Sequence, residues 1–187
     1  MAINVNAQHV KSEKDLGTPN RPLPGRYHVV INRVDESEQE YPNKVVVDFE
    51  VRAGTTPNQE GRVAREFFAT TSAAMDRLIK LGLCTGLLKP GESKDVEFSR
   101  ALGCQLVIDV EPHSYTDKNG QTVETTCVAF LGIHKPDDRS VADVPKDPQL
   151  AQLYRGDPAT QTPVDVPRPS DGGTQTGGDD DDEWAQL

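Results

Sequence analysis

The chain ends in five consecutive acidic residues followed by its only tryptophan. The run is Asp179, Asp180, Asp181, Asp182 and Glu183, and it leads into Trp184 and a final Leu187. An acidic run usually keeps a segment solvated and extended, whereas large aromatic side chains are rare in disordered segments and favoured at interfaces. The pattern predicts a partner-binding tip at 179–187, whose acids approach a basic pocket in which Trp184, Leu187 and the terminal carboxylate bind.

Cationic and aromatic side chains gather along two segments in the first half of the chain. Lys44, Arg52, Arg62 and Arg65 lie on or beside these segments, and the second segment contains Phe67 and Phe68. Cations that follow a phosphate backbone, with flat side chains on which bases stack, are the requirements for binding a single-stranded nucleic acid. We therefore take the four cations as candidate phosphate contacts.

Adjacent residues of a strand face opposite sides, so one of the two phenylalanines should point outward. Phe67 shares its parity with Val63, which predicts Phe67 in the core and Phe68 on the outer face as the stacking residue. The alternative is that both rings pack, one inside the sheet and one under a helix, because aromatic side chains are usually buried.

Residues with catalytic or metal-binding potential do not form a recognisable site. Asp48 and Glu50 share one strand face, but a metal-dependent nuclease needs further ligands and usually a lysine. The four histidines have no ligand spacing with one another or with the cysteines, and neither a phosphate-binding glycine loop nor a nucleophile motif is present. We expect a protein that is not an enzyme and that binds no metal or cofactor.

The pattern of apolar residues predicts five strands and one helix. Alternating residues indicate strands at 27–31, 45–51, 62–70, 106–110 and 123–133. Between the third and fourth strands, the spacing changes to that of a helix, with Ser72 as N-cap and Gly82 as its end. The fold class is therefore all-β with one helix, and this order of elements predicts a five-stranded OB-like Greek-key barrel plus a disordered acidic C-terminal tail.

The segment Asp117-Lys118-Asn119-Gly120 predicts a hairpin between the last two strands, because Asn-Gly tolerates positive φ. Tyr115 and Lys118 then lie where OB-folds close over a ligand, although an ordinary exposed turn is the alternative reading. Tyr41 is a weaker candidate, since the acids that precede it would repel phosphate.

Composition and charge divide the chain into four parts. Only 35% of the residues are hydrophobic, and residues 137–187 carry four Lys/Arg and twelve Asp/Glu, a net charge of −8 out of −10. We expect a flexible lead at 1–23, a barrel domain at 24–136, a disordered Pro/Gly-rich linker at 137–178 and the acidic tip at 179–187. Because the charge is segregated, the overall acidity does not exclude a nucleic-acid partner.

The cysteines and the hydropathy indicate the compartment. Cys84, Cys104 and Cys127 form no CxxC pair, and three thiols leave one unpaired in any disulfide scheme, which favours reduced core thiols of a cytoplasmic protein. No apolar run is long enough to span a bilayer, so we expect no membrane association.

Gly25-Arg26-Tyr27, the run Val45–Val51 and Leu102-Gly103-Cys104 resemble segments of small phage proteins that are encoded beside recombination genes. A five-stranded barrel, a flexible linker and an acidic, hydrophobic-tipped C-terminus are together similar to single-stranded DNA-binding proteins of bacteria and phages. The tail differs from the bacterial form, which ends in Ile-Pro and a terminal Phe.

The resemblance implies a phage-encoded protein of the host cytoplasm that binds single-stranded DNA in replication or recombination. It also implies that the tail recruits partner enzymes and competes with DNA for the groove, and homo-oligomers are compatible with it. Two alternatives remain open. One is a protein-interaction adaptor whose barrel binds protein, and the other is an acidic DNA mimic that inhibits a host nuclease.

Overall fold

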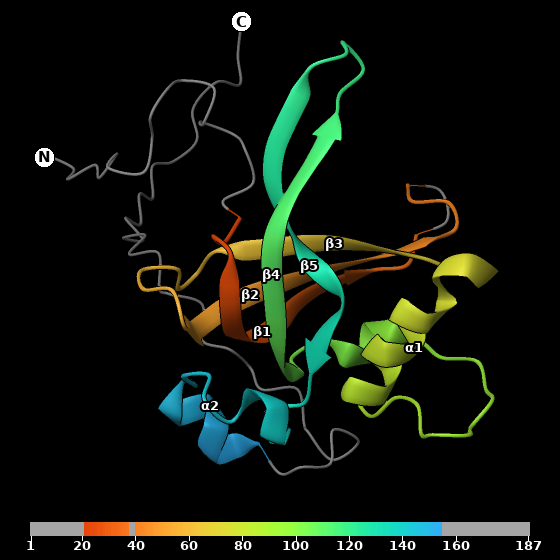
Figure 1. Ribbon diagram of the computed structural model, residues 1–187. Helices are drawn as coiled ribbons and strands as arrows, with labels where there is room; N and C mark the ends of the chain where they lie inside the picture. The colour runs from red at the N-terminus through yellow and green to blue at the C-terminus, as the bar shows by residue number, and fades with distance from the viewer. Residues whose placement is uncertain (1–20, 38–39, 155–187) are drawn as a thin grey trace, which may run out of the picture.

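Five antiparallel strands form a single sheet in the computed structural model, which describes residues 21–37 and 40–154 (Figure 1). The strands are β1 (Gly25–Asp35), β2 (Lys44–Gly54), β3 (Val63–Ala69), β4 (Gln105–Thr116) and β5 (Thr122–His134). Their order in the sheet is β3-β2-β1-β4-β5. The expected mostly-β fold with five strands is confirmed.

Short helices flank the sheet, and there are more of them than expected. The helix α1 (Met75–Cys84) follows a 3-10 turn, η2 (Ser72–Ala74), and further short elements are η3 (Phe98–Ala101), η4 (Arg139–Val141) and α2 (Pro148–Leu153). The expectation of one helix is therefore wrong. The helix α1 also continues through Gly82, and the left-handed residue that follows its end is Gly86, with φ of +71°.

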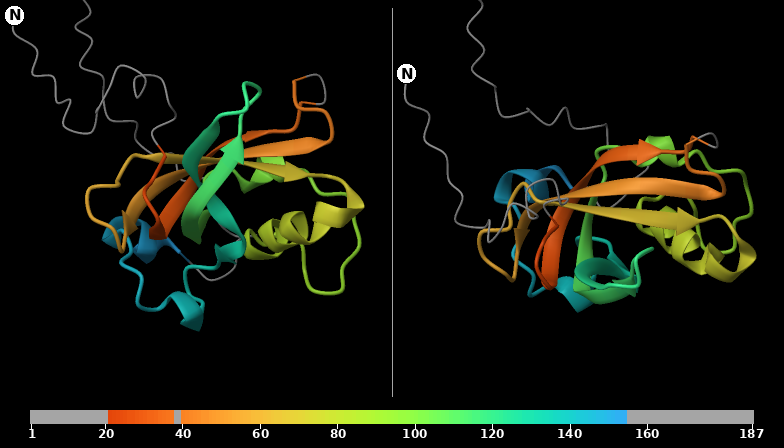
Figure 2. Two further views of the ribbon diagram at one scale, coloured as in Figure 1. Left: turned by 45° about the horizontal axis from the view of Figure 1, so that its top comes forward. Right: turned by 90° about the horizontal axis from the view of Figure 1, so that it is seen from above.

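The sheet is open, which corrects the expected closed barrel. Within the described residues, β3 and β5 are the two edges, and no ladder of backbone hydrogen bonds joins them. The strands nevertheless curl around a common core, so the two edges approach each other, while α1 and α2 lie on opposite sides of the sheet (Figure 2).

Side chains bridge the gap between β3 and β5. The Glu66 carboxylate on β3 accepts hydrogen bonds from the backbone N–H of Val128 on β5 at 2.9 Å and from Arg77 Nη2 at 2.8 Å. The Arg77 guanidinium donates to the Phe67 and Val128 carbonyls at 3.4 and 3.0 Å. The Arg21 guanidinium donates to the backbone carbonyls of residues 65 and 126 at 2.8 and 2.6 Å. We call Arg21, Glu66 and Arg77 the seam cluster, because it replaces the missing ladder.

The inner face of the curled sheet carries the hydrophobic core. Tyr27, Val29 and Ile31 alternate inward on β1, and the same period on β2 gives Val45, Val47, Phe49 and Val51. These two predicted strands are confirmed. The helix α1 covers one end of this core with Leu78, Leu81 and Cys84.

The predicted register of β3 is wrong by one residue. Phe68 is 1% exposed and packs edge-on against Phe49, whereas Phe67 is 43% exposed. The inward residues of β3 are Ala64, Glu66 and Phe68. The prediction takes its parity from Val63, which is only partly buried, whereas a buried carboxylate occupies the middle inward position of the strand.

Residues 137–154, expected as the start of a disordered linker, instead pack on the outer face of β1 and β4. Val141 and Val144 form a small buried cluster with Val107. The Gln105 amide donates to the Leu150 carbonyl at 2.8 Å, and the Asp147 backbone N–H donates to Nδ1 of His28 at 3.1 Å. The structured part of the chain thus continues at least to Tyr154.

The hairpin turn between β4 and β5 is confirmed. Gly120 has φ of +78°, and the Asp117 side chain accepts from the backbone N–H groups of residues 119 and 121. Figure 1 shows the hairpin projecting beyond the other three strands. Residues 1–20 and 155–187, which include the rest of the expected linker and the acidic tip, lie outside the described residues.

The three cysteines are free thiols, as expected. Cys84 and Cys104 are buried in the core, and burial raises the pKa of Cys104 to about 11, so this thiol is unreactive at neutral pH. No helix in the described ranges is long and apolar enough to cross a membrane.

The seam cluster gives a stability prediction. Glu66→Ala removes a carboxylate that is only 7% exposed and leaves Arg77 and the Val128 N–H without their acceptor. We expect the free energy of unfolding to fall by about 3–5 kcal/mol, the usual cost of breaking a buried ion pair. Urea unfolding would measure this loss. Glu111→Ala, at an exposed position of β4, is the control and should change stability by less than about 0.5 kcal/mol; equal losses in both variants would contradict the role of the seam.

The buried His28 gives a pH prediction. The ring accepts from the Asp147 N–H at Nδ1 and therefore donates from Nε2 to Gln105, and burial lowers its pKa below the ordinary 6.5. As the pH falls below 6.5, the unfolded chain binds a proton that the folded chain does not, so stability decreases. The slope contributed by this group is at most about 1.4 kcal/mol per pH unit.

Unfolding of the wild type and of His28→Gln between pH 5 and 8 would measure this slope. Arg52, Lys146 and Asp147 also face the ring, and they are unchanged in both proteins. The difference in slope therefore isolates the histidine. An unchanged slope in His28→Gln would refute the assignment.

Candidate nucleic-acid interface

A groove of about 430 Å³ lies between β3 and the β4–β5 hairpin. One wall is formed by Arg65 and Phe67 of β3, and the other by His113 and Tyr115 of β4 with residues 123–127 of β5. Arg21 and Glu66 of the seam cluster also line it. The groove therefore follows the open edge of the sheet, directly over the seam.

Phe67 forms an aromatic cluster at one end of this groove. Its ring centroid lies 6.0 Å from that of Tyr41, and the Lys44 ammonium lies 5.7 Å from the Phe67 ring centroid. Lys44 is exposed at the start of β2, so one cation stands directly beside an exposed flat ring. Phe67, rather than the predicted Phe68, is the outward-facing aromatic residue of β3.

Tyr115 forms a second aromatic pair on the hairpin. It is 50% exposed and stacks with His113 on the same face of β4, at 6.4 Å between ring centroids and an interplanar angle of 23°. The hairpin thus carries one flat surface toward the groove, and β3 carries another. Tyr115 lines the groove, and its expected role in closing over a ligand stays a prediction.

Arg65 lines the groove, but its charge is compensated. Its guanidinium binds the Asp48 carboxylate through two hydrogen bonds of 2.7 Å each, and Asp48 is buried on β2. The same carboxylate raises the pKa of Arg65. This bidentate geometry fixes the side chain on the outer face of the sheet and reduces its value as a phosphate contact.

The other predicted cations do not line the groove. Arg52 forms ion pairs with Glu50 and with Asp147 beside α2. It lies near the C-terminal end of β2, whereas Lys44 lies at the start of that strand. Arg62 donates to the Arg21 carbonyl at 3.1 Å and so holds the segment that carries the seam. Lys118 is exposed in the hairpin turn, beyond the residues that line the groove.

Sequence reasoning missed Phe67, His113 and Arg21 as groove residues, and it missed Tyr41 as the ring that packs against Phe67. Phe67 was placed in the core, and His113 was considered only as a metal ligand. Tyr41 was set aside because of its acidic neighbours, although its ring packs on Phe67. If Glu66 were predicted to face inward, Phe68 would be predicted inward and Phe67 outward, as observed. The sequence contains no signal that this carboxylate is buried.

The groove offers stacking surfaces and few uncompensated charges. Two aromatic clusters, Tyr41–Phe67 and His113–Tyr115, can each take a base on an exposed face. Among the cations at the groove, Arg65 and Arg21 are held by partners within the fold. In the described part of the chain, no group of three His, Cys, Asp or Glu side chains is placed to hold a metal ion.

A scan against protein-family models and a search of the curated proteins found no match for this chain.

Proposed function

We propose that this protein binds single-stranded DNA in the groove between β3 and the β4–β5 hairpin. The observation that carries the proposal is the position of exposed aromatic rings on both walls of one groove, Phe67 on one wall and His113 with Tyr115 on the other. Base stacking on such rings tolerates any sequence, because every base has an aromatic face. Lys44 beside Phe67 supplies a cation next to a stacking position.

The fold supports the same proposal. An open five-stranded antiparallel sheet with α1 between β3 and β4 is compatible with an OB-like arrangement, a partly open Greek-key barrel that binds oligonucleotides on its strand 2–3 face and its hairpin loops. The groove involves β3 and the β4–β5 hairpin among these elements. The resemblance to phage proteins adds a role in replication or recombination, with the tip at 179–187 recruiting partner enzymes.

A second candidate function is protein binding by the folded part, and one observation favours it. Phe130 and Leu131 are 52% and 55% exposed. They belong to a bulge in β5. On β4, Ile108 pairs with Ile133 and Val110 pairs with Val128. Residues 129–132 therefore all lie opposite Asp109. Two adjacent exposed apolar side chains are typical of an interaction surface, which is the adaptor alternative.

Replacing the exposed phenylalanine of β3 tests the proposed function. Phe67→Ala should weaken binding of the full chain to fluorescent oligo-dT by about 1–3 kcal/mol, the usual contribution of one base–aromatic stack, with little loss of thermal stability. Phe68→Ala should instead reduce the unfolding free energy by about 3–5 kcal/mol, because its ring is buried. Anisotropy titration and thermal melting measure the two effects.

Phe130→Ala is the matched control, since it removes an equally exposed ring outside the groove and should leave DNA affinity unchanged. A wild-type chain that binds no oligonucleotide would reject the proposed function. Binding that Phe67→Ala and Phe130→Ala affect equally would place the DNA elsewhere.

The cations give a second test, based on salt dependence. Lys44→Ala should lower the slope of log affinity against log salt by about 0.7, the value for one phosphate contact of a single strand. Arg52→Ala, in which the lost side chain is paired with Glu50 and Asp147, should leave the slope unchanged. Titrations of both variants at several salt concentrations measure the two slopes. A lower slope in Arg52→Ala and an unchanged slope in Lys44→Ala would place the phosphate path near α2 instead.

A further inference from the structure

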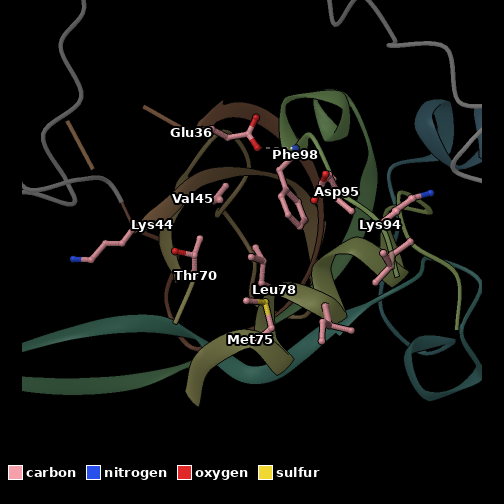
Figure 3. Close-up of a pocket in the computed structure, with 12 residues that line it drawn as sticks. Glu36, Lys44, Val45, Thr70, Met75, Leu78, Lys94, Asp95 and Phe98 are labelled. Atoms are coloured by element: carbon pink, nitrogen blue, oxygen red, sulfur yellow. Dashed lines mark hydrogen bonds between the residues drawn. The ribbon is translucent and has the colours of Figure 1, made fainter. Parts of the chain in front are cut away.

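A second hollow, of about 510 Å³, opens at the end of the sheet where α1 covers the core. Its apolar lining includes Val45, Met75, Leu78, Ile79, Val96 and Phe98. Figure 3 shows Val45, Met75, Leu78 and Phe98 pointing into a common space, while Lys44 extends away from its edge. The volume lies within the usual range of pockets that bind small organic groups.

The polar side chains of this pocket stand at its rim. Glu36 is already used, because its carboxylate accepts the backbone N–H groups of Phe98 and Ser99 at 2.8 and 3.0 Å. Thr70 supplies an exposed hydroxyl and Asp95 an acceptor, and the Lys94 ammonium, which pairs with Glu92 at 2.9 Å, has further N–H donors. An occupant with two apolar faces and an edge of mixed donors and acceptors fits this lining, and a nucleobase has that chemistry.

Lys44 connects the lining of the pocket to that of the groove. Lys44 lines the pocket, and its ammonium lies 5.7 Å from the ring of Phe67, which lines the groove. A single strand that stacks on Phe67 therefore passes Lys44 at the mouth of the pocket. Lys44 is positioned to contact the phosphate between a stacked base and the next nucleotide.

We propose that the pocket takes one unstacked nucleobase of the bound single strand. The base inserts over Met75 and Leu78, and its edge meets Thr70, Lys94 and Asp95. This inference rests on the proposed function, because the same strand occupies the groove. It adds a position at which the protein reads the edge of a base rather than only its face.

An abasic scan tests the pocket. The full chain is titrated with the shortest oligo-dT that keeps full affinity, so that the strand cannot slide without losing groove contacts, and one nucleotide at a time is made abasic. In the wild type, each abasic nucleotide over the groove should reduce the affinity, and we call this reduction the abasic penalty. These penalties should disappear in Phe67→Ala and Tyr115→Ala, which lack the rings on which the bases stack. One further position should keep its penalty in both variants, about tenfold in affinity for the loss of one buried base.

Ile79→Trp identifies that further position, since Ile79 is 39% exposed on α1 and lines the pocket but not the groove. The added indole should fill the pocket and abolish the tenfold penalty, while the groove penalties remain. Leu131→Trp, at an exposed apolar position that lines neither site, should retain all penalties, and thermal melting verifies that both variants fold.

Three results would overturn the inference, and they separate it from the proposed function. If the wild type binds but every abasic penalty disappears in the groove variants, the pocket is empty and the proposed function stands. A further penalty that survives in Ile79→Trp places that base outside the pocket. If no oligonucleotide binds at all, the proposed function fails and the pocket is not a nucleobase site.

Discussion

The arrangement of this protein depends on one buried carboxylate, that of Glu66. It sits where the two edges of an open sheet meet, and a charge in that position is tolerated only when it is fully hydrogen-bonded. Arg77 and the Val128 N–H satisfy it from α1 and β5. The contact therefore joins the two edge strands, β3 and β5, to each other and to α1.

The same contact explains how two sheet edges remain next to each other without a ladder. Unpaired strand edges expose carbonyl and N–H groups that template aggregation. Here the guanidinium groups of Arg21 and Arg77 donate to carbonyls on both edges, two on β3 and two on β5. Planar groups with several donors suit this bridging role better than an ammonium would. The gap that they span is also the floor of the groove. The seam cluster that holds the two edges together therefore also shapes the candidate site.

The sequence allowed the strands, α1 and the hairpin to be predicted, because each depends on local pattern. Alternation placed β1 and β2 correctly, and Asn-Gly located the turn that carries Tyr115 outward. The register of β3 depended on Glu66, whose burial is a tertiary effect that no local rule contains. The packing of residues 137–154 was missed for a similar reason: Val141, Val144 and Leu150 are too few to form a periodic pattern, and only the outer face of β1 and β4 makes them a core.

Compensated charge is the property that distinguishes this groove from a simple basic cleft. Arg65 is neutralised by Asp48, and Arg21 donates to main-chain carbonyls and Glu66. Electrostatic attraction along the groove is therefore small, and in the proposed function stacking on Phe67 and Tyr115 supplies most of the affinity for a single strand. Stacking falls less steeply with salt than phosphate neutralisation does. In the proposed complex the protein holds a single strand through its bases, and its arginines remain available to hold the sheet together.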